Sequence, residues 1–185
     1  MNSNAEIVAA LKGKDDKQRA EAIHSAPAIG APVVPAIAPL LGDANVEVRR
    51  AARRALEGTV HHAARTGIGK EAGAVETALI AALGSDSVAV RREVLWLLSE
   101  VGGDASVPAV SALLGNPELR EDARCVLQRI PGRKSLNALK DALKTVPADF
   151  KPNVAESLRK RGEKVSGYPS QRLVPTKKTA VASPQ

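Results

Sequence analysis

The chain has 185 residues and a formal net charge of +7, with 44% hydrophobic but only 2% aromatic residues. So few aromatic residues among many alanines and leucines are typical of thin, closely packed helices, and they disfavour a sheet core. The length is sufficient for one domain of about five short helical repeats.

The sequence shows no sign of disulfide bonding, secretion or membrane insertion, and this predicts the cellular compartment. The single cysteine, Cys125, cannot form an internal disulfide, which fits a reducing environment. The first residues, MNSNAEIVAALKG, contain no basic segment followed by a long apolar run, so neither a secretory signal nor a membrane span is expected. We therefore expect a cytoplasmic protein.

The positive charge is concentrated at the C-terminal end. Residues 1–158 contain 20 bases and 19 acids, a net charge of +1, whereas residues 159–185 contain seven bases and one acid. A nearly neutral body lacks the extended basic surface that nucleic-acid binding requires. Nucleic-acid binding is therefore the weaker alternative, and it would depend on the basic tail.

One pattern recurs five times and predicts five pairs of helices. Each copy has an anchor leucine with an apolar residue four positions earlier, which makes an apolar stripe on a short helix. The anchors are Leu11, Leu41, Leu83, Leu114 and Leu143, at spacings of 30, 42, 31 and 29 residues. A base follows each anchor by eight residues, or six in the fourth copy, with apolar residues three and seven positions beyond it. These positions predict a second amphipathic helix in each unit.

In chain order, the first unit (residues 4–28) is polar, as expected of a terminal repeat. The proline-containing run 25–35 is expected to interrupt the helices. The sequence VPAIAPLLG (34–42) returns as VPAVSALLG (107–115), and the second helix of the second unit is expected over 46–64. The third unit is expected over 75–102, and the fourth and fifth at 104–130 and 133–162, with Phe150 in the core.

Two segments resemble a known repeat family. LLGDANVEVRRAARRAL (40–56) and LGSDSVAVRREVLWLL (83–98) resemble HEAT-like repeats of the short, phycobilisome-lyase type, and the resemblance covers residues 5–162. The family turn, Gly-Asp followed by Val-Arg, is matched best by Asp43 and Arg49. The second copy departs from the pattern through about 12 extra residues around 58–70. The resemblance implies an all-α, right-handed, armadillo-like α-solenoid of about five helix pairs.

Helical projection separates the core face of the second helices from an exposed row. Positions five residues after each repeated base point away from the apolar stripe. This row is His24, Arg54, Trp96, Cys125 and Glu156. If the second helices line the concave side, as in HEAT solenoids, the row lies along a groove.

The arginines divide into two predicted roles. The repeated bases are expected to brace the turns and the stack by bridging turn carboxylates; this set is Arg49, Arg91 and Arg120, with Asp43 as a turn residue. A second set is expected to meet a protein partner: Arg50, Arg53, Arg54, Arg92, Trp96 and Cys125. Tryptophan beside arginine is typical of interaction hot spots. Alternatively, Trp96 packs across the seam between units and adds to the core. The thiol of Cys125 is expected to be inert.

No catalytic, metal or cofactor site is predicted. Adjacent His61 and His62 point about 100° apart on a helix and have no further ligand motif. The GIGK segment (67–70) is not a phosphate loop, because Ala64 replaces the first glycine and Glu71 replaces the Ser or Thr that binds magnesium.

A non-catalytic interaction scaffold is therefore the leading functional hypothesis. The alternatives are an enzyme or enzyme auxiliary and a weak nucleic-acid binder. HEAT-like relatives include phycobilin lyase subunits and deoxyhypusine hydroxylase, but the His-Glu pairs of the hydroxylase are missing here. HEAT-like alkylpurine glycosylases use a basic, aromatic-lined groove, which one tryptophan does not reproduce.

The predicted domain boundary follows the end of the periodic pattern. Residues 4–162 are expected to form the solenoid and residues 163–185 a flexible basic tail. The tail is either a docking segment that uses Tyr168, Leu173 and Val174, an electrostatic arm for nucleic acid, or an uninvolved terminus.

Overall fold

The computed structural model describes residues 3–65 and 69–169, and the regular structure in these ranges is entirely helical. Five helix pairs follow one another along this part of the chain. The first-helix layer consists of α1 (Asn4–Lys12), η1–α3–η2 (Ala31–Val33, Val34–Ile37, Ala38–Gly42), α5 (Gly69–Ala82), α7–η3 (Val107–Ser111, Ala112–Gly115) and α9 (Arg133–Thr145). The second-helix layer consists of α2 (Asp16–Ile29), α4 (Val46–Ala63), α6 (Val88–Val101), α8 (Arg120–Arg129) and α10 (Lys151–Lys160).

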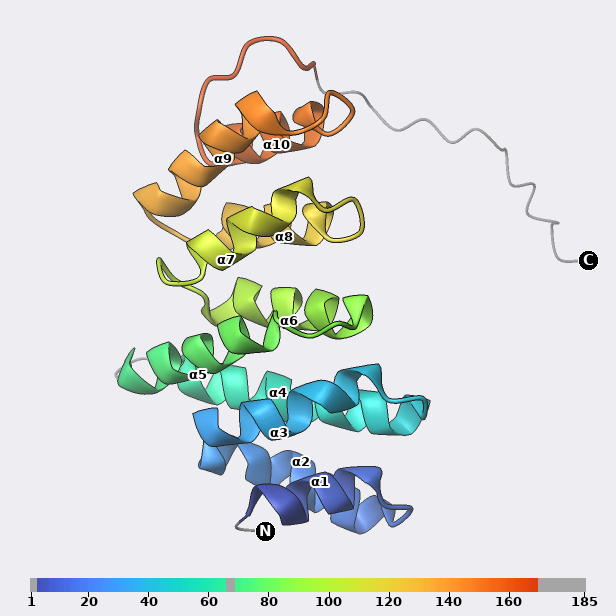
Figure 1. Cartoon of the computed structure of the whole chain (residues 1–185). Coiled ribbons are helices and arrows are strands. Elements are labelled where there is room, and N and C mark those ends of the chain that lie inside the picture. Colours follow the sequence, from blue (N-terminus) through green and yellow to red (C-terminus); the bar gives the residue numbers. More distant parts are fainter. Residues whose placement is uncertain (1–2, 66–68, 170–185) are drawn as a thin grey trace, which may run out of the picture.

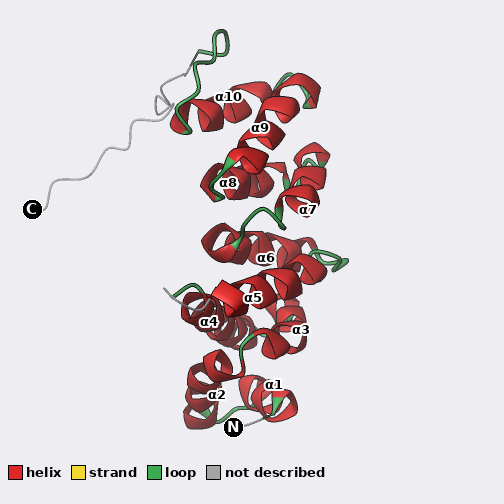
Figure 2. Cartoon of the chain, turned by 90° about the vertical axis from the view of Figure 1, so that its left-hand side faces the viewer, coloured by secondary structure: helices red, strands yellow, loops and turns green. Residues whose placement is uncertain are grey.

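The pairs stack into an elongated array, with α1 and α2 at one end and α9 and α10 at the other (Figure 1). Figure 2 shows the two layers in cross-section, with α2, α4 and α8 on one side and α1, α3 and α7 on the other. Successive second helices contact each other from α2 to α10. The predicted all-α solenoid of helix pairs is confirmed.

Polar side chains cap the beginnings of α2 and α4. Asp15 accepts hydrogen bonds from the amides of Lys17 (2.8 Å) and Gln18 (3.1 Å) at the start of α2. Asn45 caps α4 in the same way, by accepting from the amide of Glu47 (2.9 Å). These contacts satisfy amides that the helix itself leaves without acceptors.

Proline divides the first helices of the second and fourth units. In both, one short α-helical segment that begins Val-Pro is followed by a 3₁₀ segment that ends in glycine. Pro35 and Pro108 occupy the first turns, where an amide would have no helical acceptor. The repeated sequence at 34–42 and 107–115 therefore has one repeated structure.

The expected interruption at 25–35 comes later than its first proline. α2 continues through Pro27 to Ile29 and ends at Gly30, whose φ of 73° is accessible to glycine at little cost. Pro27 lies against α4 at Gly58, where an added Cβ would come within 3.2 Å of the proline Cγ. A glycine at position 58 thus permits the close approach of α2 and α4.

The extra residues of the second copy lengthen its second helix. α4 spans Val46–Ala63, close to the expected 46–64, and α5 is described from Gly69 onward. The predicted core positions of the second helices are buried, including Leu98 at 0% exposure and Phe150 at 3%. Of the anchor leucines, only Leu143 is half-buried, and it packs against the same core. Within the described ranges, no helix combines the length and apolarity needed to cross a membrane.

Candidate functional site

The repeated bases brace the turns in two different ways. Arg49 donates through Nη1 to the main-chain oxygens of Asp43 (2.7 Å) and Ala44 (3.0 Å). Arg120 instead reaches forward to the next unit, with Nη2 2.6 Å from Asp149 Oδ2 and its guanidinium carbon 4.7 Å from the centroid of the Phe150 ring.

The expected contact of Arg49 with a turn carboxylate is thus replaced by contacts with carbonyl oxygens. The Asp43 carboxylate accepts from the amide of Asn45 instead (2.9 Å). The Nε of Arg91 is buried without a hydrogen-bond partner in the described part of the chain. Asp43 and Arg49 therefore hold the main-chain turn before α4, and Arg120 holds the contact with the next unit. Arg91 makes no such bond through Nε.

Trp96 is half-buried and packs against the core, with Arg53 of the preceding unit over its ring. The Arg53 guanidinium carbon lies 4.9 Å from the ring centroid, a cation–π distance. Arg53 also donates to Glu57 (2.8 Å) and lies 3.5 Å from Glu93 of α6. The hydrogen bond with Glu57 raises the pKa of Arg53 further above its ordinary value, so the side chain stays charged. The structure combines the two alternatives for Trp96, because the ring lies at the seam and is still partly exposed.

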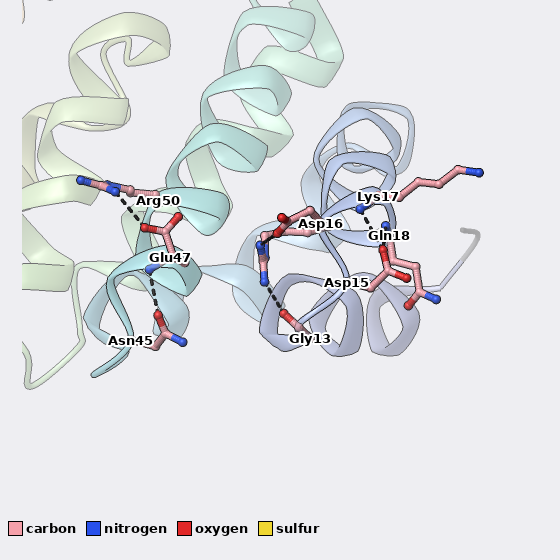
Figure 3. Close-up of polar contacts among 9 residues, drawn as sticks. Gly13, Asp15, Asp16, Lys17, Gln18, Asn45, Glu47 and Arg50 are labelled. Atoms are coloured by element: carbon pink, nitrogen blue, oxygen red, sulfur yellow. Dashed lines mark hydrogen bonds and ion pairs between the residues drawn. The ribbon is translucent and has the colours of Figure 1, made fainter.

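Arg50 and Arg92 are exposed on neighbouring second helices. Arg50 Nη1 donates to Glu47 Oε1 (2.8 Å) on the same helix, and its guanidinium extends away from Asp16, toward the third unit (Figure 3). Arg92 bridges from α6 to α8, since Nε donates to Asp122 (3.1 Å) and Nη2 to the carbonyl of Glu118 (2.8 Å).

These arginines converge on one depression between α4 and α6, which we call the α4–α6 hollow. Its volume is about 310 Å³. Its lining residues are Leu41, Val46, Arg49, Arg50, Arg53, Ala89, Arg92 and Glu93. Four arginines and one glutamate thus line this space, and Arg50, Arg53 and Arg92 also pair with Glu47, Glu57 and Asp122 outside the lining. Val46, at 43% exposure, is the large hydrophobic residue left exposed among those described.

The other predicted partner-binding residues lie elsewhere. Arg54 is exposed and lines a separate hollow between α2 and α4, together with Arg50 and Ile23. Cys125 lies between α8 and α10, in a larger hollow of about 880 Å³. Partial burial raises the pKa of the Cys125 thiol, which disfavours the reactive thiolate. The predicted residues other than Trp96 therefore line three separate hollows of the second-helix layer.

The exposed row from the helical projection lies where the periodicity places it. His24, Arg54 and Cys125 are exposed, and Trp96 and Glu156 are half-buried. The row follows the second-helix layer from α2 to α10. Its members border different hollows: Arg54 lines the one between α2 and α4, and Cys125 and Glu156 line the one between α8 and α10.

The described part of the expected tail is held against α10. Arg159 Nη2 donates to the carbonyl oxygens of Val165 (3.3 Å), Gly167 (2.8 Å) and Tyr168 (2.7 Å). Tyr168 also lines the hollow that contains Cys125. Leu173 and Val174, the other predicted docking residues, lie outside the described residues, as does most of the basic tail.

The histidines take part in small local contacts. His62 Nε2 lies 2.7 Å from Arg65 Nη2 and 3.9 Å from Glu71 Oε1. Residues 3–65 and 69–169 contain no group of three or more His, Cys, Asp or Glu side chains that could hold a metal ion. Residues 67 and 68 of the GIGK segment lie outside the described residues.

Sequence reasoning missed the polar side chains that join one unit to the next. Glu76 of α5 accepts hydrogen bonds from the amides of Gly103 (2.7 Å) and Ser106 (3.0 Å), and from Ser106 Oγ (2.7 Å). Arg161 covers the end of α8, where Nη1 donates to the carbonyls of Leu127 (3.0 Å) and Ile130 (2.7 Å). The sequence carries one signal for Arg161, because it lies just beyond the last apolar position of the fifth unit.

No protein-family model and no curated protein matches the sequence. Among solved structures, an engineered protein has 20% identity and a TM-score of 0.44, covering 86% of this chain and 79% of that chain. A designed armadillo repeat protein has 14% identity and a TM-score of 0.45, covering 85% and 82%. Another, in complex with the peptide (KR)4, has 15% identity and a TM-score of 0.46, covering 83% and 78%. These distant likenesses contain no information about what this chain binds, and the resemblance to short HEAT-like repeats stays an interpretation of the sequence.

Proposed function

We propose that the chain is a non-catalytic interaction scaffold that binds a segment of another protein along its second-helix layer. The observation that carries this proposal is the α4–α6 hollow, where four arginines and the exposed Val46 lie beside a partly exposed tryptophan. Arginine and tryptophan contribute strongly to protein interfaces, because they combine large contact areas with directed polar contacts.

Stacked helix pairs also provide a suitable surface for an extended ligand. The second helices follow each other as neighbours through all five units, and hollows lie between α2 and α4, α4 and α6, and α8 and α10. Successive residues of an extended peptide can thus contact successive units. The arginine bridges between units hold these helices in register before a partner binds, which lowers the entropic cost of binding.

A peptide-display selection against the immobilised full-length chain tests this function. We expect enriched peptides to bind the wild type and to lose at least about tenfold in affinity for the double variant Arg50→Glu/Arg54→Glu, because charge reversal at an interface opposes the partner's charges. The matched control is Lys12→Glu/Arg133→Glu, which reverses two exposed charges of the first-helix layer.

Each result has a distinct meaning. Binding that survives in the control and is lost in the second-helix variant supports the proposal, provided that both variants melt cooperatively. A selection without enrichment contradicts it. Equal losses in the two variants also contradict it, because they indicate attraction by overall charge rather than a site on the second helices.

A further inference from the structure

We infer that the α4–α6 hollow receives an acidic side chain of the partner protein, with an adjacent aliphatic side chain of the same segment packed on Val46. This inference rests on the proposed function and specifies the chemistry of the partner. It commits to a protein segment that carries aspartate or glutamate next to a leucine-like residue.

The lining of the hollow favours a negatively charged ligand. Arg49, Arg50, Arg53 and Arg92 line the hollow with Glu93, while Glu47, Glu57 and Asp122 pair with three of the arginines from outside the lining. A carboxylate that enters this space gains charge-assisted hydrogen bonds, and the planar guanidinium group suits a carboxylate with two oxygens. A basic segment would meet like charges instead, so the lining selects against it.

Arg50 and Arg92 both have N–H donors left for a ligand. Arg50 uses Nη1 for Glu47, and within the described residues its Nε and Nη2 have no hydrogen-bond acceptor. Arg92 uses Nε and Nη2 for the α8 unit, and its Nη1 has none. Since an arginine has five N–H donors, both side chains can bind an incoming carboxylate without giving up the contacts shown.

Part of the lining is apolar. Val46, the first residue of α4, is 43% exposed, and Leu41 and Ala89 border the same space. An aliphatic side chain that covers Val46 would remove this apolar surface from water. The carboxylate would also lie near the first turns of α4 and α6, where helix dipoles favour negative charge.

The overall charge distribution favours a protein over a nucleic acid. Residues 1–158 carry 20 bases and 19 acids, so the arginines of the hollow form a local cluster in a nearly neutral body. Binding of single-stranded nucleic acid uses a long basic track and several aromatic platforms. Here the one tryptophan is covered on a face by Arg53.

Fluorescence anisotropy of labelled peptides tests the inference. The probes are a peptide of alternating glutamate and leucine, its glutamine–leucine and lysine–leucine counterparts, and a single-stranded DNA oligonucleotide. We expect binding of the glutamate–leucine peptide only, with an affinity that falls as salt is raised. Because Trp96 is the single tryptophan and lies at the same seam, its emission is expected to change during the titration.

The variants locate the contact. Arg50→Glu and Arg92→Gln are each expected to weaken the glutamate–leucine peptide by about tenfold, as for the loss of a charge-assisted contact. Val46→Ser is expected to weaken it by a smaller factor. Arg133→Glu, in α9, is the charge control and is expected to change the affinity less than threefold, about 0.65 kcal/mol.

Several outcomes overturn the inference. Equal binding of the glutamine–leucine peptide, tighter binding of the oligonucleotide, or equal losses in Arg50→Glu and Arg133→Glu would each do so. If display-selected peptides bind but contain no acidic residue, this inference fails and the interaction function stands. If no display-selected peptide binds at all, both fail.

Discussion

The guanidinium of Arg53 lies over the ring of Trp96, with its central carbon 4.9 Å from the ring centroid, although the two residues belong to different units. The contact joins α4 to α6 at the surface while both helices bury their apolar faces beneath it. Trp96 therefore contributes to the cohesion of the stack and to the surface beside the α4–α6 hollow. A partner that binds there meets an arginine–tryptophan pair that is already in place.

Removing the arginine should uncover the ring. In Arg53→Ala, we expect Trp96 emission at longer wavelength and a loss of about 0.5–2 kcal/mol in the free energy of unfolding, the range of a cation–π contact. Emission spectra and thermal melts measure both effects, since the chain has one tryptophan. Arg50→Ala, on the same helix, is the control and should leave the emission unchanged. Unchanged emission in Arg53→Ala would show that the pair does not form.

The core face of the second helices can be tested at Leu98, which is fully buried in α6. Leu98→Asp removes about 1.5–3 kcal/mol of apolar burial and introduces a carboxylate that has no partner, so the array should lose cooperative unfolding. Circular dichroism melts measure this. Arg54→Asp, at an exposed position of α4, should stay folded. A Leu98→Asp protein that melts like the wild type would refute the assignment of this face.

The core was predictable because burial follows a local period. Leu98 and Phe150 occupy positions that recur at helical spacing from the repeated base, and repeat stacking buries that face in every unit. The proline-rich first helices were less predictable. Their 3₁₀ segments depend on how each proline fits the packed turn, which the apolar spacing does not specify.

The partners of the arginines were not predictable from the periodicity. Arg53 meets Trp96, and Arg92 meets Asp122 thirty positions further along the chain. Which side chains meet across a seam depends on the rotation and offset of two helices, and a change of one position turns a side chain by about 100°. The sequence thus predicted an exposed arginine surface, but not that four arginines would share one hollow.

Arg161 should stabilise the C-terminal unit in particular. Its guanidinium donates to the carbonyls of Leu127, Ile130 and Gly132, which lie at the end of α8 or in the turn that follows. Hydrogen bonds from a charged donor are worth about 1.5–3 kcal/mol, so Arg161→Ala should lower stability by at least this amount. Hydrogen exchange should become faster in α9 and α10 and stay unchanged in α1 to α4. The neighbouring exposed Lys160→Ala is the control, and uniform acceleration along the whole chain would contradict the local role.

The contact between α8 and α10 should weaken in acid. Arg124 donates to both oxygens of Glu121, and Asn153 of α10 donates to one of them (3.2 Å). These bonds hold the pKa of Glu121 below its ordinary value, and the bond from Arg124 is the larger cause.

A carboxyl group whose pKa is lower in the folded than in the unfolded state stabilises the fold at pH values above its unfolded pKa, about 4.3. This contribution is lost as the pH falls through the folded pKa. At pH 7 the wild type should therefore have a larger free energy of unfolding than Glu121→Gln. The difference should be less than about 1 kcal/mol, because Glu121 is exposed, and it should vanish in acid. Denaturant titrations of both proteins across this pH range measure the difference directly. A difference that stays constant with pH would mean that the Glu121 charge does not stabilise the fold.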